Sequence, residues 1–390
     1  KWVNVDYSAT PYKYYHVFAR DPEYANYLTV GHAKDQLTNL KTALKDVTTY
    51  NVTEYDTPYG KQYFIPAAQI SSEGAASYTS SWVRDSVWNI LSLKKEGRAQ
   101  DAINCTKSLF QYFRTENQYK RMDNVLTEPT ILLQKKGAMN GVHIRFNAHT
   151  LEDVQENGED QYWSHKQNDA LGLFLSLAVD FAKEHLGDTT VWSADEQSKD
   201  MIAMVRLVSY LNYIDYWDME DSGAWEEIEK IACSSVACVT AAMQSIIKAY
   251  DDPNDSRFKN AYDAARNTFS DRQGLNEYYF DYSNPKDTVG NEPTNCGINN
   301  AISRAYWKTI IRSVDDVTTG GESVRYPKSD DEYRRADSAM LNLIYPYPLS
   351  STVAIKNYQD PSGEPWTFDI TKKVNVLMIG EENNNDYGVM

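Results

Sequence analysis

Basic residues are scarce in this chain. It holds 39 Lys and Arg against 55 Asp and Glu, which gives a formal net charge of −16 at pH 7. A general nucleic-acid binder needs a basic face for the phosphates, so this balance argues against such a partner. Long apolar runs are missing as well, because the longest, 171–179, is far shorter than the roughly 20 residues of a membrane span. We therefore expect a soluble globular protein with neither nucleic acid nor membrane as a partner.

Cysteines are also few. The four that are present, Cys105, Cys233, Cys238 and Cys296, allow at most two disulfides, and their number does not identify a redox compartment. If 231–250 is helical, Cys233 and Cys238 are separated by about 7.5 Å along the helix axis, which is beyond the usual reach of a bridge. The other pairings stay open.

Glycosylation signals and the first residue favour secretion. The sequons begin at Asn51, Asn104 and Asn254. The chain opens at Lys1 rather than Met, as a processed secretory product does. We expect a secreted glycoprotein.

Several common chemical signatures are absent from the sequence. It has no His, Cys and Asp spacing typical of a metal site, no Gly-rich phosphate loop and no G-x-S-x-G elbow. We therefore expect neither a metal nor a cofactor. Aromatic residues, in contrast, are abundant, with 29 Tyr, 11 Phe and 9 Trp. Their flat amphipathic faces suit a sugar ligand, although Tyr also suits a protein core in which its hydroxyl is bonded.

Helical periodicity dominates the chain from Ala33 onward. Apolar residues recur at i, i+3, i+4 and i+7 in 83–91 and 201–211, which predicts amphipathic helices. Segment 171–181 is apolar nearly all round and 231–249 is rich in Ala, Ser and Cys, so both suit inner helices with close neighbours. Further helices are predicted at 34–50, 98–115, 256–269, 298–314 and 331–343. Strand signals are sparse and no linker divides the chain. We predict one all-α domain over 1–390 with an N-terminal extension, 1–32, packed on it.

The first of three polar motifs is Ser-Trp-Val-Arg-Asp-Ser at 81–86, where a predicted helix begins. Asp85 in a first helical turn is favoured by the helix dipole, and an Arg-Asp pair is common on surfaces. Alternatively, Arg84 and Asp85 present fixed donors and acceptors to the vicinal hydroxyls of a sugar.

The second motif, 163–172, runs from Trp163 into the most apolar helix of the chain. Polar groups at the mouth of a buried helix need partners. His165 could act as a general base, but a solvated or hydrogen-bonded side chain is the commoner state, and the sequence pairs it with no nucleophile.

The third motif is Gly-Ala-Trp-Glu-Glu at 223–227, just ahead of the helix rich in small residues. Adjacent carboxylates there are often solvent-facing charges at a helix start. Trp225 favours another interpretation, because an acid placed against an indole is desolvated and its pKa rises. Such an acid can protonate a glycosidic oxygen.

In this order the motifs resemble glycoside hydrolase family 15, the glucoamylase family, whose relatives include phosphorylase kinase regulatory subunits. The resemblance runs from about Phe64 to the end of the chain and includes 65–68 (Ile-Pro-Ala-Ala). It implies an (α/α)6 barrel, Arg84 and Asp85 as the holders of the terminal glucose, and Glu226 as the general acid. It further implies substrate contacts by a set of five residues: Trp163, Gln167, Asp169, Trp225 and Glu227. Asp337 falls where the family has an Asp entering a helix.

The departures from the family are informative. Gly223 stands where the family's acid loop has an Asp, and the family's base, a Glu, follows the region that resembles 374–390. We find no residue to carry as the base. Two explanations stay open. Either a second polypeptide segment supplies the remaining helices and the base, so that the barrel of this chain is incomplete at its C-terminal end, or the protein has lost catalysis and keeps a sugar pocket.

The resemblance implies an inverting, exo-acting α-glucosidase that releases glucose from the non-reducing ends of α-glucans. A non-catalytic glucan-binding or regulatory module on the same scaffold is the alternative, because a fold does not fix a function. A structural glycoprotein with Tyr at packing contacts is the third hypothesis.

Overall fold

The computed structural model describes residues 2–7, 13–18, 38, 52–66, 80–268, 298–311, 321–323, 337–350, 352–359 and 365–369. The chain forms two compact units, Lys1–Asn51 and Val52–Met390. In the first unit, β1 (Trp2–Tyr7) and β2 (Lys13–Phe18) pair as an antiparallel hairpin. The predicted extension, 1–32, lies within this unit, and its packing on the rest of the chain stays a prediction.

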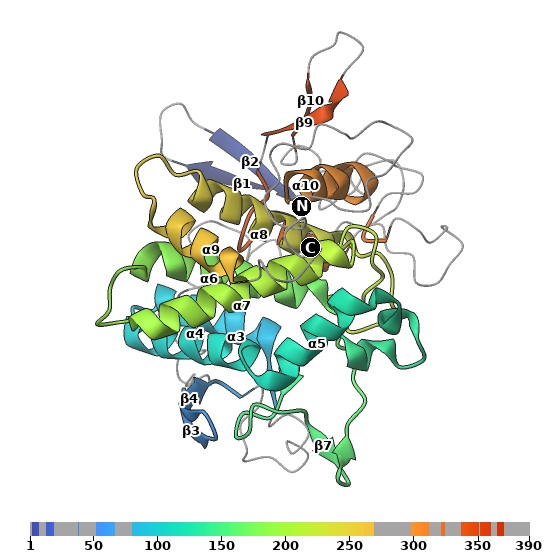
Figure 1. Ribbon diagram of the computed structural model, residues 1–390. Helices are drawn as coiled ribbons and strands as arrows, with labels where there is room; N and C mark the ends of the chain where they lie inside the picture. The colour runs from blue at the N-terminus through green and yellow to red at the C-terminus, as the bar shows by residue number, and fades with distance from the viewer. Residues whose placement is uncertain are drawn as a thin grey trace. The chain divides into compact units, whose positions relative to one another are not determined.

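The second unit is mostly helical (Figure 1). Its α-helices are α3 (Val83–Lys95), α4 (Ala99–Phe113), α5 (Glu116–Thr127), α6 (Asn168–His185), α7 (Ala194–Tyr213), α8 (Cys233–Tyr250), α9 (Arg257–Asn267) and α10 (Ile298–Ala305). Shorter helical turns are η2 (Pro129–Leu133), η3 (Gly137–Asn140), η5 (Tyr306–Ile310) and η6 (Ser338–Leu343).

The strands of this unit form two-stranded antiparallel pairs. These are β3 (Thr53–Thr57) with β4 (Gly60–Phe64), β5 (Ser81–Trp82) with β6 (Arg145–Phe146), β7 (Gln155–Glu156) with β8 (Glu159–Asp160), and β9 (Thr352–Gln359) with β10 (Pro365–Asp369). The β5–β6 pair matters most for the site, because it places Arg145 opposite Trp82, immediately before α3.

The two predicted inner helices are confirmed. Nearly every residue of α6 from Asn168 to Ala182 is buried, as is most of α8, and the two helices pack along each other (Figure 1). Gly172 permits this contact, because a Cβ there would lie 2.5 Å from the backbone of Cys238 and Val239. Around them α3 packs on α4 and α6, and α7 packs on α9.

Some predicted boundaries differ from the structure. The helix expected at 34–50 lies outside the described residues except for Thr38, and the described end of 331–343 is the 3₁₀ turn η6 rather than an α-helix. The apolar pattern does not predict α5, because this helix is largely polar and buries only Gln118, Met122 and Val125.

The cysteines and sequons can be placed in part. Cys105, Cys233 and Cys238 are buried free thiols, which confirms that Cys233 and Cys238 are not bridged, and Cys296 lies outside the described residues. Asn254 is exposed in a turn, whereas Asn104 lies within α4; Asn51 is not described. Within the described residues no helix has both the length and the apolar character for crossing a bilayer.

Candidate active site

The three sequence motifs meet at the guanidinium of Arg84. Its Nε donates to Asp169 Oδ2 at 2.5 Å and its Nη2 to Asp169 Oδ1 at 3.1 Å. Nη2 also donates to the Gln167 side-chain oxygen and, at 3.1 Å, to the Gly223 carbonyl. One side chain from the start of α3 therefore joins the start of α6 to the loop ahead of α8. We call Arg84, Gln167, Asp169, Gly223 and Glu226 the Arg84 cluster.

Glu226 is the exposed carboxyl of this cluster. Its Oε1 lies 3.6 Å from Arg84 Nη1, and its side chain remains 26% exposed, so a ligand can reach it. Burial raises the pKa of Glu226, while the charge of Arg84 and a hydrogen bond from Gln167 oppose that rise. Its backbone is left-handed, with φ +57°, a conformation that non-glycine residues rarely adopt and that is frequent at functional sites.

Glu227 points elsewhere than Glu226. Its carboxylate pairs with Lys230 at 3.7 Å, and its backbone N–H donates to the Ser222 carbonyl at 3.1 Å. The two acids lie in a turn ahead of α8 rather than at its N-terminus, because α8 begins at Cys233. The geometry thus places the two neighbouring acids beside different cations, Arg84 and Lys230.

Asp85 lies beside the cluster in the first turn of α3. Its side chain is exposed, yet the surrounding protein desolvates its carboxyl enough to raise its pKa, against the attraction of Arg84. It therefore adds a second accessible acidic group near Glu226, whose pKa it raises further.

An aromatic wall adjoins the cluster. The rings of Trp82 and Trp163 lie 6.0 Å apart, edge to face, and the Arg145 guanidinium lies over both, at 4.2 Å from Trp163 and 5.1 Å from Trp82. Arg145 is only 3% exposed, and within the described part of the chain its Nε and Nη1 have no hydrogen-bond partner. Burial lowers the pKa of Arg145, and the negative charge of Glu226 opposes this lowering.

Arg145 is not among the residues that the sequence motifs single out. The alternation of Val142 and Ile144 with polar neighbours hints at a strand, but nothing in it shows that β6 pairs with the residues before α3.

Trp225 lies at the surface of the loop that carries Glu226. The residue is 51% exposed, and its indole Nε1 donates to Asp337 Oδ1 at 2.8 Å. Asp337 also accepts a hydrogen bond from Ala339 N at 2.8 Å, which caps η6. Asp337, singled out from the sequence, is therefore tied to the acid loop through Trp225.

Two buried carboxyls hold the starts of the inner helices. Asp221 Oδ2 accepts from Asn168 N at 2.8 Å, and Glu322 accepts from Ser234 N at 3.1 Å and from the Ser234 hydroxyl. Burial is the main cause that raises the pKa of each to about 8. Neither residue stands out in the sequence, because each binds the first turn of a helix to which it does not belong.

His165 is buried rather than solvated. Its Nδ1 accepts from Ile144 N at 3.3 Å, and its ring stacks on His143 at 3.5 Å. Burial lowers the pKa of His165 well below its usual value, and the neighbouring charge of His143 adds to this effect. His165 therefore supports the backbone ahead of the cluster. In the described residues there is also no grouping of three or more His, Cys, Asp or Glu side chains that could hold a metal ion.

Comparison with known proteins identifies the family. The model of "Glycosyl hydrolases family 15" matches residues 40–358. The chain is 34% identical over 224 residues to "Uncharacterized lipoprotein YgeQ" of Escherichia coli (strain K12). The aligned region makes up 55% of this chain and 82% of that protein. It is 40% identical over 53 residues to "Putative protein YgeP" of the same organism, which covers 14% of this chain and 50% of that protein.

A solved structure, "Glycosidase Wild Type", matches 62% of this chain with 19% identity and a TM-score of 0.40. The chain spans 58% of the length of that glycosidase. The family match and the mostly helical structure confirm the predicted all-α class and its (α/α) toroid type. Since the family model covers far more than half of its residues, the chain belongs to glycosyl hydrolases family 15.

Proposed function

We propose that this protein is an inverting, exo-acting α-glucosidase that releases glucose from the non-reducing ends of α-glucans. The observation that carries the proposal is Glu226, an accessible carboxyl with a raised pKa, held 3.6 Å from Arg84 where three motifs meet. A carboxyl that keeps its proton towards neutral pH is what a glycosidic general acid needs.

In this proposal Glu226 donates its proton to the glycosidic oxygen as the bond from that oxygen to the anomeric carbon breaks. Water attacks the anomeric carbon from the opposite face, and a carboxylate base about 6.5–9.5 Å from the acid takes the proton of that water. The family resemblance puts this base outside the residues named above, and we propose that a further polypeptide segment supplies it.

Arg84 has a positioning role in this scheme. Most of its donors are engaged by Asp169, Gln167 and Gly223, so the guanidinium holds the acid loop against α6. Sugar hydroxyls are left to groups that remain accessible, chiefly Asp85 and Glu226.

The tryptophans supply the apolar part of the site. We assign Trp163, stacked with Arg145, and the exposed Trp225 as surfaces against which a sugar ring packs. The loop that carries Glu226 is held in position by Gln167, Asp169 and Glu227, through their contacts with Arg84 and Lys230. Their effect on the substrate is therefore indirect.

The test compares Glu226→Gln with Glu227→Gln as its matched control, in the protein with its complete active site. We expect Glu226→Gln to lower glucose release from maltose and starch by a factor of about 100 or more with KM similar, because an amide has no acidic proton to give. Glu227→Gln should change mainly KM. Nearly unchanged turnover in Glu226→Gln would remove it from the acid role, and α-glucose as the first product by NMR would exclude inversion.

A non-catalytic glucan-binding protein is the second candidate. The engagement of Arg84 by protein groups is compatible with it, since a guanidinium that only positions a loop serves binding as well as hydrolysis. Binding of maltoheptaose without any release of glucose by the complete protein would support this candidate.

We also propose that the protein is exported and glycosylated. The exposed Asn254 sequon and the name of the relative YgeQ, a lipoprotein, support this placement. A mass decrease on enzymatic deglycosylation that is smaller in Asn254→Gln than in the wild type would test it.

A further inference from the structure

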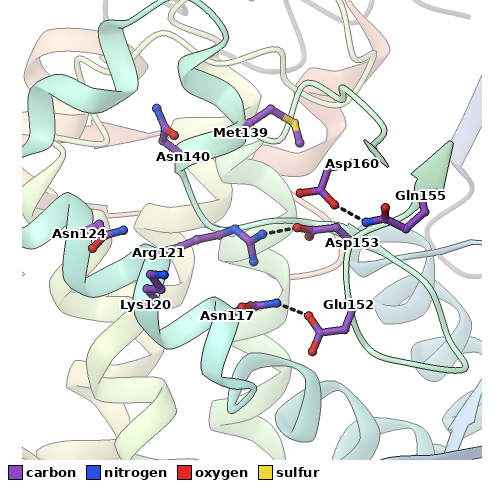
Figure 2. Close-up of a pocket in the computed structure, with 10 residues that line it drawn as sticks. All are labelled: Asn117, Lys120, Arg121, Asn124, Met139, Asn140, Glu152, Asp153, Gln155 and Asp160. Carbon is purple, nitrogen blue, oxygen red and sulfur yellow. Dashed lines mark hydrogen bonds and ion pairs between the residues drawn. The ribbon is translucent and has the colours of Figure 1, made fainter. Parts of the chain in front are cut away.

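A polar cavity of about 480 Å³ lies between α5, η3 and the segment 152–160. None of the residues of the Arg84 cluster lines it. Figure 2 shows its lining side chains, which come from α5, from η3 and from the loop that carries β7 and β8. Its volume is in the range of small-molecule sites.

The lining combines carboxamides with nearly balanced charge. The carboxamides are Asn117, Asn124, Asn140 and Gln155. Two cationic residues, Lys120 and Arg121, face three acidic ones, Glu152, Asp153 and Asp160, and Arg121 is paired with Asp153. A carboxamide both donates and accepts hydrogen bonds, as a sugar hydroxyl does. A free anion would meet three carboxylates here, so the chemistry favours a neutral polyhydroxylated ligand.

The cavity shares a wall with the segment that leads into the Arg84 cluster. Met139 lines the cavity, and its sulfur accepts a hydrogen bond from Trp163 N at 3.3 Å. Asp153, also in the lining, bonds His143 Nδ1 at 2.6 Å, and His143 stacks on His165. The backbone from Trp163 to Gln167 is thus fixed on one side to the cavity and on the other to Arg84.

We propose that this cavity is a second saccharide-binding site, which takes sugar units of a neutral α-glucan beyond those held at Glu226. The inference rests on the proposed function for the identity of the sugar. The amide nitrogens of Asn117 and Gln155 donate to Glu152 and Asp160 (Figure 2), so their amide oxygens remain to accept from the hydroxyl groups. Asn124 and Lys120 supply further hydrogen-bonding groups.

The test uses Lys120→Ala with Asn124→Ala, both at exposed positions of α5 where alanine favours the helix. The matched control is Lys199→Ala with Asn267→Ala, the same residue types at exposed positions of α7 and α9. Titration calorimetry on the full chain measures maltose and maltoheptaose. We expect the α5 variant to bind maltoheptaose about tenfold more weakly than the control, from the loss of two hydrogen-bonding groups, and maltose within about twofold.

A second measurement identifies the source of the sugar. Lower kcat/KM for maltoheptaose means that the same chain fills both sites, whereas weaker adsorption to glycogen alone means that a separate glucan chain binds. Both results support the site. Equal maltoheptaose and glycogen binding by the α5 variant and its control would overturn it, as would binding of inorganic phosphate in preference to maltoheptaose.

The failure of this inference is separable from that of the proposed function. Binding is measured without turnover, so an active Glu226→Gln enzyme would refute the acid assignment and leave the cavity result standing. If the wild-type chain binds no maltoheptaose, the cavity inference fails, whatever its hydrolytic activity.

Discussion

Replacing Asp221 by asparagine should remove the part of the pH dependence of stability that this carboxyl contributes. The Asp221 carboxyl is fully buried at the start of α6, where burial and the charge of Asp169 raise its pKa from 3.8 to about 8. Between about pH 4 and pH 8 the folded protein therefore holds a proton that the unfolded chain has released. Asparagine keeps an oxygen that can accept the hydrogen bond from Asn168 N, but it does not titrate.

The sign and size of the effect follow from that window. Because the folded state binds the extra proton, the contribution is greatest below the unfolded pKa and is lost as pH rises towards the folded pKa. The slope is about −1.4 kcal/mol per pH unit, so two units within the window lower the free energy of unfolding by roughly 2.7 kcal/mol. Glu322, whose pKa is also raised to about 8, adds a similar slope to both proteins and cancels in the comparison.

Urea unfolding of the wild type and of Asp221→Asn at roughly pH 5 and pH 7 measures this difference. We expect the wild type to lose about 2–3 kcal/mol more than the variant between the two pH values. Parallel losses in the two proteins would refute the reasoning, because they would mean that Asp221 is ionised in the folded state throughout.

Three further predictions concern the inner helices and the acid. Gly172→Ala should lower the Tm by several degrees, because its Cβ would lie 2.5 Å from the backbone of α8; calorimetry beside exposed Ser198→Ala checks this, and equal Tm values would contradict it. Glu226→Gly should raise the free energy of unfolding measured in urea by up to about 1 kcal/mol, because glycine adopts the positive φ of this position without strain, while glucose release is lost. A lower free energy of unfolding in the variant would mean that the backbone at Glu226 is not strained. Asp169→Asn should move the alkaline limb of the pH profile of kcat/KM to lower pH, because the positive charge of Arg84, no longer neutralised by Asp169, then lowers the pKa of Glu226. An unmoved limb would mean that Asp169 has no influence on the pKa of Glu226.

Sequence periodicity predicted the parts of the fold that repeat along one helix. The apolar sides of α3 and α7 and the all-round burial of α6 follow from spacing within one segment. Helix α5 was not predicted, because it buries few side chains and so has a weak apolar pattern. The turn η6 is too short to show a periodic pattern. Local patterns thus failed where burial is sparse.

The same distinction applies to the site. Arg84, Gln167 and Asp169 were identified from the sequence as separate motifs, but their joining depends on the close packing of α6, α8 and α3. Arg145 and Asp221 contact residues that are far from them in the sequence, since Arg145 lies opposite Trp82 and Asp221 binds the backbone of Asn168. The spacing of the residues around each of them therefore does not predict these partners. Sequence reasoning named the polar residues at the helix starts and could not name the residues that support them.

The division of one positive charge explains how the pKa of an acid can be raised beside an arginine. Arg84 lies 2.5 and 3.1 Å from the buried Asp169 but 3.6 Å from Glu226, so most of its attraction is directed to Asp169. Asp169 itself repels a negative charge on Glu226, as does Asp85. Glu226 also stands on a loop ahead of α8 rather than in the first turn of a helix, where the dipole would favour its ionised form. Desolvation therefore outweighs the guanidinium, so the pKa of Glu226 is raised even beside the cation that holds the loop in place.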